Sequence, residues 1–405
     1  MKIRSITVFV NPHWPLERDV LGKAGTFLDL ARPAFQSAGY EVETARLATV
    51  PFPRLIPDLD LQALTEFART LEMEAGAIGY NYISLGPALP DRLDSFVCIP
   101  DLLAVTENVF FSGVMTTPGG GVSLAAVQAC AEVIRRSAPL SPDGFSNLRF
   151  AALANVPPGA PFFPAAYAGD NLPAFALATE AADLAVEAFT RAKSLAEARQ
   201  NLTETLENHA QILATTAQEL AGQLGFTFGG IDFSLAPFPQ EALSLGTALE
   251  RLGVPATGLH GSLAAAAILA DTIDRASFPH TGFSGLMLPV LEDSNLARRA
   301  AEELLSVKDL LLYSAVCGTG LDTIPLPGDT SSAALAAILL DLAALAQRLN
   351  KPLTARLMPI PGKHVGDTTG FDFAYFANSR VMSLEARPLS GLFAGGETFE
   401  LHPRK

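Results

Sequence analysis

The chain has 405 residues, of which 49% are hydrophobic and 17% are charged, and its formal net charge is −14. Soluble chains carry about 25% charged residues on average, so this composition indicates a large interior for the available surface. The acidic balance argues against a nucleic acid or an anionic membrane as partner, because both bind faces that are dense in lysine and arginine.

Strand-like and helix-like segments alternate along the whole chain. Short apolar runs predict strands at residues 3–10, 41–48, 77–85, 109–115, 150–156, 226–233, 285–291, 310–316, 353–357 and 371–382. Apolar spacing of three and four residues predicts helices at residues 16–37, 61–74, 122–136, 173–193, 195–223 and 331–349. Apolar strands joined by helices are typical of a parallel or mixed sheet, open or closed. We expect one α/β domain over residues 1–405, with a helical insertion around 173–224.

Targeting and redox signals are weak. The N-terminal run MKIRSITVFV is too short for a signal peptide and continues into Asn11 to Pro15 instead of a cleavage site. No stretch reaches the roughly 18 uninterrupted apolar residues of a membrane span. The cysteines Cys98, Cys130 and Cys317 form no CxxC pair, so neither a zinc finger nor a disulfide framework is indicated. We therefore expect a cytoplasmic protein.

The segment Met358 to Phe373, MPIPGKHVGDTTGFDF, is the richest in polar side chains that suit a site. It follows a predicted strand, and loops at the carboxyl ends of strands in α/β proteins often carry function. Lys363 beside Asp367 would lower the pKa of that carboxyl and could bind an anionic group. The alternative is a turn in which Asp367 caps backbone N–H groups.

Five separated motifs resemble a known family. They are IRSITVFVNPHWPL, GGIDFSLAPFP, GFSGLMLPVLED, CGTGLDTIPLPGDT and MPIPGKHVGDTTGFDFAYFANSRVM. Together they resemble domain-of-unknown-function family 711, found in bacteria and archaea, over essentially the whole chain. The resemblance implies an α/β barrel of ten strands like that of pyruvate formate-lyase, with two parallel halves, helices outside and an interior loop. It implies no settled reaction.

The loop from Cys317 to Thr330 is a second candidate. In barrels of the pyruvate formate-lyase type, the interior cysteine carries a thiyl radical, and Cys317 is the cysteine placed in this way. Its glycyl partner would be Gly391, after Arg387 and Ser390, although the match is poor. The alternative is a small buried thiol. Asp322 and Asp329 in the same loop are stronger candidates for chemistry.

Three further positions carry polar groups near predicted strand ends. Asp232 and Ser234 alternate with apolar residues, so both point to one face, where a buried aspartate must be paired, protonated or metal-bound; a strand-end hydrogen bond is the equal alternative. Glu292 is a site candidate, whereas we expect Asp293 to cap the following helix. His260 lies in a loop and could act as an acid or base. The glycines at 119–121 could bind an anion, but a tight turn is favoured.

We predict an enzyme that uses carboxylate acid/base chemistry, in hydrolysis or elimination, on a small polar or sugar-like metabolite. The predicted catalytic residues are Asp232, Asp329, Lys363, Asp367 and Glu292. The predicted substrate-binding residues are Ser234, His260, Thr330, His364, Asp372, Cys317 and Asp322. Mg²⁺ or Ca²⁺ could bridge Asp232, Asp329 and Asp367. The alternatives are a metabolite-binding or regulatory protein without turnover, and a thiol or radical enzyme using Cys317. The long Ala/Leu-rich helices would suit a homodimer, but the sequence does not fix the assembly.

Overall fold

A single mixed sheet forms the centre of the computed structural model, which describes residues 1–403. Its nine strands lie in the order β10-β11-β7-β4-β3-β2-β1-β8-β9. The strands are β1 (Lys2–Val10), β2 (Val42–Thr49), β3 (Tyr82–Ala88), β4 (Val109–Val114), β7 (Phe150–Ala154), β8 (Ala174–Glu180), β9 (Thr227–Ala236), β10 (Gly320–Pro327) and β11 (Leu353–Ile360). Neighbouring strands are parallel except at β1–β8 and β7–β11. The predicted α/β class is confirmed.

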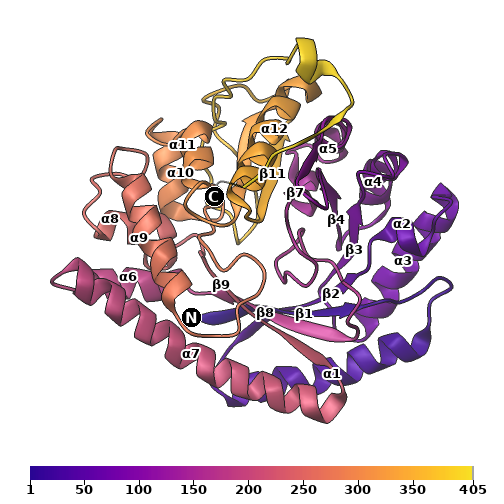
Figure 1. Ribbon diagram of the computed structural model, residues 1–405, viewed down its shortest axis with the longest axis horizontal. Coiled ribbons are helices and arrows are strands. Elements are labelled where there is room, and N and C mark those ends of the chain that lie inside the picture. Colours follow the sequence, from indigo (N-terminus) through magenta and orange to yellow (C-terminus); the bar gives the residue numbers. More distant parts are fainter. Residues whose placement is uncertain (404–405) are drawn as a thin grey trace.

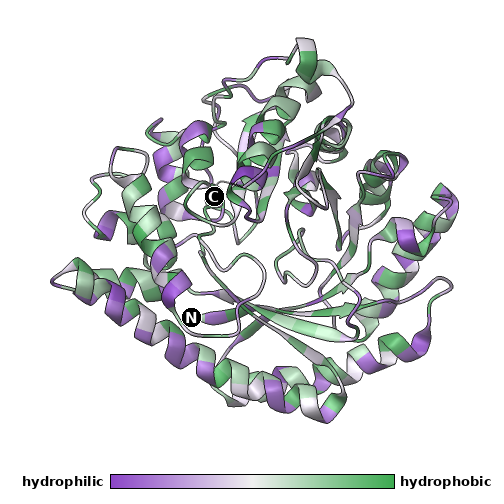
Figure 2. Cartoon of the chain, in the orientation of Figure 1, coloured by the Kyte–Doolittle hydropathy of each residue, from purple (hydrophilic) through white to green (hydrophobic). Residues whose placement is uncertain are grey.

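Helices lie around the outside of the strands (Figure 1). They are α1 (Arg18–Ser37), α2 (Phe52–Leu55), α3 (Leu61–Ala77), α4 (Asp94–Val105), α5 (Leu124–Ser137), α6 (Ala182–Arg191), α7 (Leu195–Leu224), α8 (Leu245–Arg251), α9 (Ser262–Arg275), α10 (Ser294–Ala301), α11 (Val307–Tyr313) and α12 (Ser332–Leu349). A small sheet of β12 (Thr398–Glu400), β6 (Gly121–Ser123) and β5 (Thr116–Thr117) ties the C-terminal segment to α5. Hydrophilic residues lie mainly on the helices, whereas the strands are predominantly hydrophobic (Figure 2).

The segment 285–291 lies between the two edge strands of the sheet. Its Met287 N–H donates to the Ser234 carbonyl of β9 at 3.0 Å. Its Val290 N–H donates to the Asp322 carbonyl of β10 at 3.1 Å, next to a parallel bridge between Pro289 and Asp322. The segment therefore links β9 to β10, although its own backbone is too irregular to form a regular strand.

Four predictions of local structure were wrong. Residues 310–316 lie in and after helix α11, where Ser306 and Asp309 form a capping box that favours a helix over a strand. Strand β10 runs through the predicted loop. Its two prolines lie near its end, beyond the bridge between Pro289 and Asp322, where β11 is the neighbouring strand. Residues 174–180 form strand β8 instead of the start of a helix, and 371–382 is irregular.

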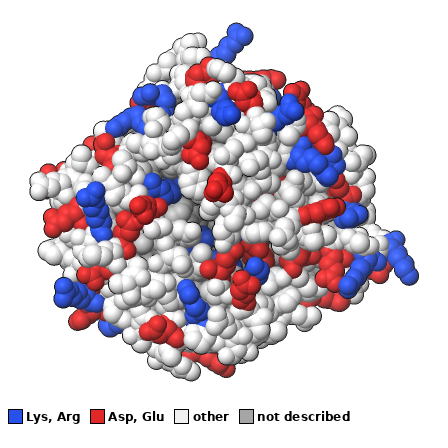
Figure 3. Space-filling view, turned by 180° about the vertical axis from the view of Figure 1, so that it is seen from behind, with Lys and Arg blue, Asp and Glu red and all other residues white. Residues whose placement is uncertain are grey.

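The described residues include one helix, α12, that is long and apolar enough to cross a membrane by length and composition. More than half of it is buried against the rest of the protein, as is common for core helices of soluble proteins. Acidic and basic side chains are interspersed on the face shown in Figure 3, between broad uncharged areas. The division into domains and the cellular location stay predictions.

Candidate active site

A cavity that is partly open to solvent lies where β1, β2, β3, β10 and β11 meet the loops around residues 162–165, 283–292 and 371–376. One part of its wall is aromatic, formed by Phe110, Phe162, Phe163, Phe283 and Phe373. The polar lining comprises Arg4, Glu43, Thr44, Arg46, Tyr82, Glu292, Thr319, Asp322, Thr354, Arg356 and Tyr375. The cavity thus combines an apolar surface with converging charged groups, as small-molecule sites usually do.

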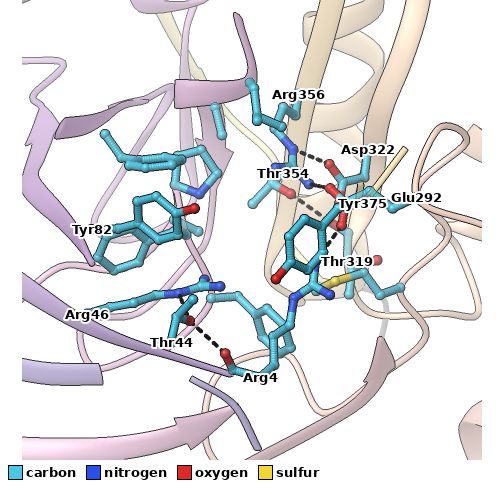
Figure 4. A pocket seen from close by; sticks show the side chains of 18 of the residues that line it. Arg4, Thr44, Arg46, Tyr82, Glu292, Thr319, Asp322, Thr354, Arg356 and Tyr375 are labelled. Carbon is cyan, nitrogen blue, oxygen red and sulfur yellow. Dashed lines mark hydrogen bonds and ion pairs between the residues drawn. The ribbon is translucent and has the colours of Figure 1, made fainter. Parts of the chain in front are cut away.

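The sequence Thr-Ala-Arg-Leu occurs twice, at residues 44–47 in β2 and 354–357 in β11. Because side chains two residues apart on a strand share a face, each copy directs a threonine and an arginine into the cavity. Figure 4 shows the two copies on different sides of the cavity, with Arg46 near Tyr82 and Arg356 near Asp322.

Arg356 and Arg4 are saturated by carboxylates. Arg356 donates through Nε to Asp322 Oδ1 at 2.5 Å and through Nη2 to Glu292 Oε1 at 2.6 Å. Arg4 donates to Glu292 Oε2 at 2.8 Å and to Glu180 Oε2 at 2.7 Å, and its Nε lies 3.6 Å from Glu43. Both oxygens of Glu292 are therefore fixed by guanidinium groups, and this network joins β1, β8, β10, β11 and the 285–292 segment.

Arg46 has a different environment, although only 8% of its surface is exposed. Its Nε donates to Thr44 Oγ1 at 3.0 Å, and the guanidinium lies 5.8 Å from the Tyr82 ring centre and 5.3 Å from that of Phe163. Within residues 1–403, no carboxylate lies in ion-pair range of Arg46. Burial and the nearby Arg4 charge lower its pKa to about 10.

Burial also changes the proton affinity of acids in and behind the cavity. It raises the pKa of Asp322 despite the opposing charge of Arg356, and it raises the pKa of Glu180. Arg356 uses only Oδ1 of Asp322, so this pair leaves Oδ2 unused. Burial and Glu43 raise the pKa of Tyr375 to about 12, so that phenol stays protonated at neutral pH. The site therefore contains groups that can hold a proton where exposed carboxyls cannot.

The loop 371–377 covers part of the cavity with aromatic side chains. Its Tyr375 ring centre lies 5.2 Å from the Arg4 guanidinium and 5.6 Å from the Phe238 ring. The Ala377 N–H donates to the Leu291 carbonyl at 2.6 Å, which ties the loop to the segment 285–291. The loop thus positions Phe373 and Tyr375 in the cavity wall.

Two of the predicted site residues, Glu292 and Asp322, meet in this cavity. Cys317 is buried near it, in the turn before Thr319, but does not line it. Asp293 caps α10, as predicted, and accepts N–H bonds from Asn295 and Leu296.

Asp232 and Ser234 share one face of β9, as their spacing indicates. Ser234 Oγ donates to Asp232 Oδ1 at 2.5 Å, and the N–H groups of Phe283 and Ser284 donate to the same carboxylate. A Cβ atom on Gly282 would lie only 2.1 Å from Asp232 Oδ2. Asp232 lies outside the cavity wall and anchors the loop that places Phe283 in it.

The other predicted site residues lie outside the cavity wall on loops. Asp367 Oδ2 accepts a hydrogen bond from the His364 N–H at 2.7 Å. Asp367 therefore caps a turn, which was the alternative to a catalytic role. Thr330 bonds the Pro327 carbonyl. The remaining members of this group are Asp329, Lys363, His364, Asp372 and His260, none of which is buried. In residues 1–403, no three or more His, Cys, Asp or Glu side chains group so that they could hold a metal ion.

The sequence reasoning missed the arginines, along with Glu43 and Tyr375. Arg4, Arg46 and Arg356 each lie within a predicted strand, and a charge buried in a sheet must have a partner. The repeated Thr-Ala-Arg-Leu segment was a further signal for two of them.

Comparisons with known proteins agree on one family. The family model described as "Uncharacterised ACR (DUF711)" matches residues 1–377. A UPF0210 protein of Pyrobaculum aerophilum is 33% identical over 394 residues, covering 91% of this chain and 87% of that protein. UPF0210 proteins of Acetivibrio thermocellus and Methanococcoides burtonii are 31% and 30% identical over 350 and 349 residues, each covering 82% of this chain and 77% of theirs.

Proposed function

This chain belongs to the DUF711 family of uncharacterised proteins, and because that description names no reaction, we propose a function from the cavity: an enzyme that performs carboxyl acid/base chemistry on a small polar metabolite. The proposal depends on the environment of Asp322. Its carboxyl lies in the cavity wall, burial raises its pKa, and Arg356 binds only one of its two oxygens. Groups tuned in this way are typical of active sites.

Asp322 is the proposed proton donor and acceptor, because a raised pKa brings a carboxyl closer to the pH at which it must gain and lose a proton. Glu292 is a positioning residue, since both of its oxygens bind guanidinium groups that it holds in place. The phenol of Tyr375 stays protonated beside the Glu43 carboxylate and lines the site. Hydrolysis and elimination both need such proton transfers.

A bound cation is not needed for this proposal. Mg²⁺ and Ca²⁺ take several oxygen ligands, while Glu292 and Asp322 are already bound by arginines. Asp232, proposed from sequence as a ligand, has its carboxylate occupied by Ser234 and two backbone N–H groups.

Non-catalytic binding is the second candidate, favoured by the saturation of Glu292, which leaves Asp322 without a free carboxylate beside it. Thiol chemistry has less support. Burial raises the pKa of the Cys317 thiol, whereas reactive thiols have a lowered pKa. Gly391, the residue compared with a glycyl radical, lies exposed in the turn Gly391–Ala394.

We also propose that the sheet closes into the ten-stranded barrel expected from the family resemblance, with the segment 285–291 as the tenth strand. The hydrogen bonds from Met287 to β9 and from Val290 to β10 support closure. The antiparallel contacts at β1–β8 and β7–β11 would then separate two parallel halves. The specific likeness to pyruvate formate-lyase stays a prediction.

The test is turnover of a defined panel of hydroxy acids, sugar acids, sugar phosphates and glycosides, followed by proton NMR in D₂O. The variant Asp322→Asn keeps the size of the side chain but cannot exchange the proton, so its rate should fall at least about 100-fold. The matched control Asp367→Asn changes a carboxyl outside the cavity and should retain the wild-type rate.

Undiminished turnover in Asp322→Asn would overturn the assignment of Asp322 as the proton donor and acceptor. Loss of turnover in Asp367→Asn would also overturn it, and would favour the loop 358–373 as the active site. A panel member that raises the thermal midpoint but is not converted would favour the binding protein. Absence of both binding and turnover across the panel would remove the proposal.

A further inference from the structure

We infer that the metabolite bound in this cavity carries an oxyanion, a carboxylate or a phosphate, next to an apolar body, and that Arg46 binds the oxyanion. The inference rests on the proposed function in one respect: it takes the cavity as the metabolite site. It goes further by naming the chemical class of the ligand and the residue that selects it.

The distribution of ion pairs singles out Arg46. Three arginines line the cavity, and Arg4 and Arg356 each contact at least two carboxylates. Arg46 is equally buried but, within the part of the chain that the structure describes, pairs with no carboxylate. A buried charge without a partner is costly unless something else compensates it, and a ligand oxyanion is the compensating group.

The geometry of Arg46 suits an oxyanion. Thr44 Oγ1 accepts from Nε at 3.0 Å and itself donates to the Arg4 carbonyl at 2.7 Å, so the side chain is held in one orientation. The rings of Tyr82 and Phe163 lie 5.8 Å and 5.3 Å from the guanidinium carbon. The terminal Nη groups are left for the cavity, and two parallel N–H donors match a carboxylate or phosphate.

The distribution of charged side chains around the cavity also favours Arg46 as the anion-binding residue. The carboxylates Glu43, Glu180, Glu292 and Asp322 all lie around Arg4 and Arg356. Among the described residues Arg46 has no ion-pair partner of its own, and Figure 4 shows Arg46 and Tyr82 apart from the ion-pair network. Burial and the Arg4 charge lower the pKa of Arg46, and the carboxylates Glu43 and Glu292 oppose this only in part.

The apolar body follows from the wall beside Arg46. Phe163 packs against Phe110 with ring centres 5.4 Å apart, and Phe110 packs against Tyr82 at 5.2 Å. Phe162 and Phe283 extend this surface. Aromatic walls of this kind favour a ring or a branched chain over a fully hydrated ligand.

The test measures binding of simple probes to the full chain by calorimetry and by thermal shift. Phenylacetate and phenyl phosphate combine an oxyanion with a ring, phenylacetamide is a neutral counterpart, and acetate lacks the ring. Phenylacetate or phenyl phosphate should bind, and the tighter of the two identifies the oxyanion as carboxylate or phosphate. Phenylacetamide and acetate should bind at least 10-fold more weakly.

The matched variants are Arg46→Met and Arg18→Met. Arg46→Met removes the guanidinium and should weaken binding of the anionic probe at least 10-fold. Arg18 is exposed and lies outside the cavity wall, so Arg18→Met should bind like the wild type. Arg46→Lys keeps the charge without the two-pronged donor and should give an intermediate affinity, which also guards against a folding defect in the methionine variant.

Equal binding of the anionic probe to Arg46→Met and wild type would overturn the inference, as would equal affinity for phenylacetamide or no binding of either anion. These outcomes differ from failure of the proposed function. Anion binding lost in Arg46→Met without turnover of any panel member would retain the ligand class and reject catalysis. Turnover of a neutral substrate with unchanged KM in Arg46→Met would retain catalysis and reject the oxyanion as ligand class.

Discussion

Arg46 and Arg356 occupy the same place in two copies of Thr-Ala-Arg-Leu, yet their partners differ. Arg356 bridges Asp322 and Glu292, whereas Arg46 bonds only Thr44. The same local sequence therefore serves two roles: Arg356 stabilises the fold through ion pairs, and Arg46 is the proposed ligand-binding residue. The difference arises from neighbouring strands, because Asp322 comes from β10 and Glu292 from the loop before α10.

This contrast predicts opposite effects on stability. Arg356→Met leaves buried Asp322 without its partner and should lower the free energy of unfolding by about 3–5 kcal/mol. Arg46→Met removes a buried charge that has no counter-charge, and should leave the free energy of unfolding unchanged or raise it. Urea denaturation of both variants measures this. A large loss of stability in Arg46→Met would mean that Arg46 supports the fold.

Residue-scale inference from sequence succeeded where the interaction is local. The N-cap role of Asp293 depends on neighbours two and three residues away, and it was predicted correctly. The arginine network depends on pairs separated by up to 288 residues, as for Arg4 and Glu292. No local pattern specifies such partners, so the predicted site centred on polar loops instead.

At the scale of elements, Asp232 joins β9 to the loop that carries Phe283. Desolvation raises the pKa of Asp232 to about 6, above its usual value. The folded state then binds the proton more tightly than the unfolded state, so this group stabilises the fold below its unfolded pKa and loses that contribution as pH rises to about 6.

The expected loss is about 2 kcal/mol between pH 4 and pH 7. Asp232→Asn cannot titrate, so the difference in unfolding free energy between wild type and variant should change with pH across this range. Denaturation at several pH values provides the measurement, and Asp329→Asn, an exposed loop change, serves as control. A wild-type-minus-variant difference that is constant with pH would show that Asp232 does not titrate there.

Element prediction from periodicity worked for long or strongly apolar segments and failed for short ones. Helix α7 and strand β1 match their predicted ranges within one or two residues. The run 310–316 is equally compatible with a strand or a buried helix by pattern, and the capping box decided for the helix. Strand β10 was missed because its prolines signal a loop.

At the scale of the whole molecule, the fold brings residues from both ends of the chain into one cavity: Arg4 from β1 and Tyr375 from the C-terminal loop face each other. The α/β class and helices outside the strands follow from alternation of elements along the sequence. The strand order does not, because it depends on pairing between β1 and β8 and between β7 and β11. Family resemblance supplied the expectation of closure that composition alone leaves open.

The most direct test of the account is a crystal structure of the protein with phenylacetate or phenyl phosphate. We predict the oxyanion within hydrogen-bond distance of Arg46 Nη1 and Nη2, the ring against Phe110 and Phe163, and Asp322 facing the bound molecule. Density for the ligand only outside this cavity, or an oxyanion bound by Lys363 in the 358–373 loop, would contradict the account.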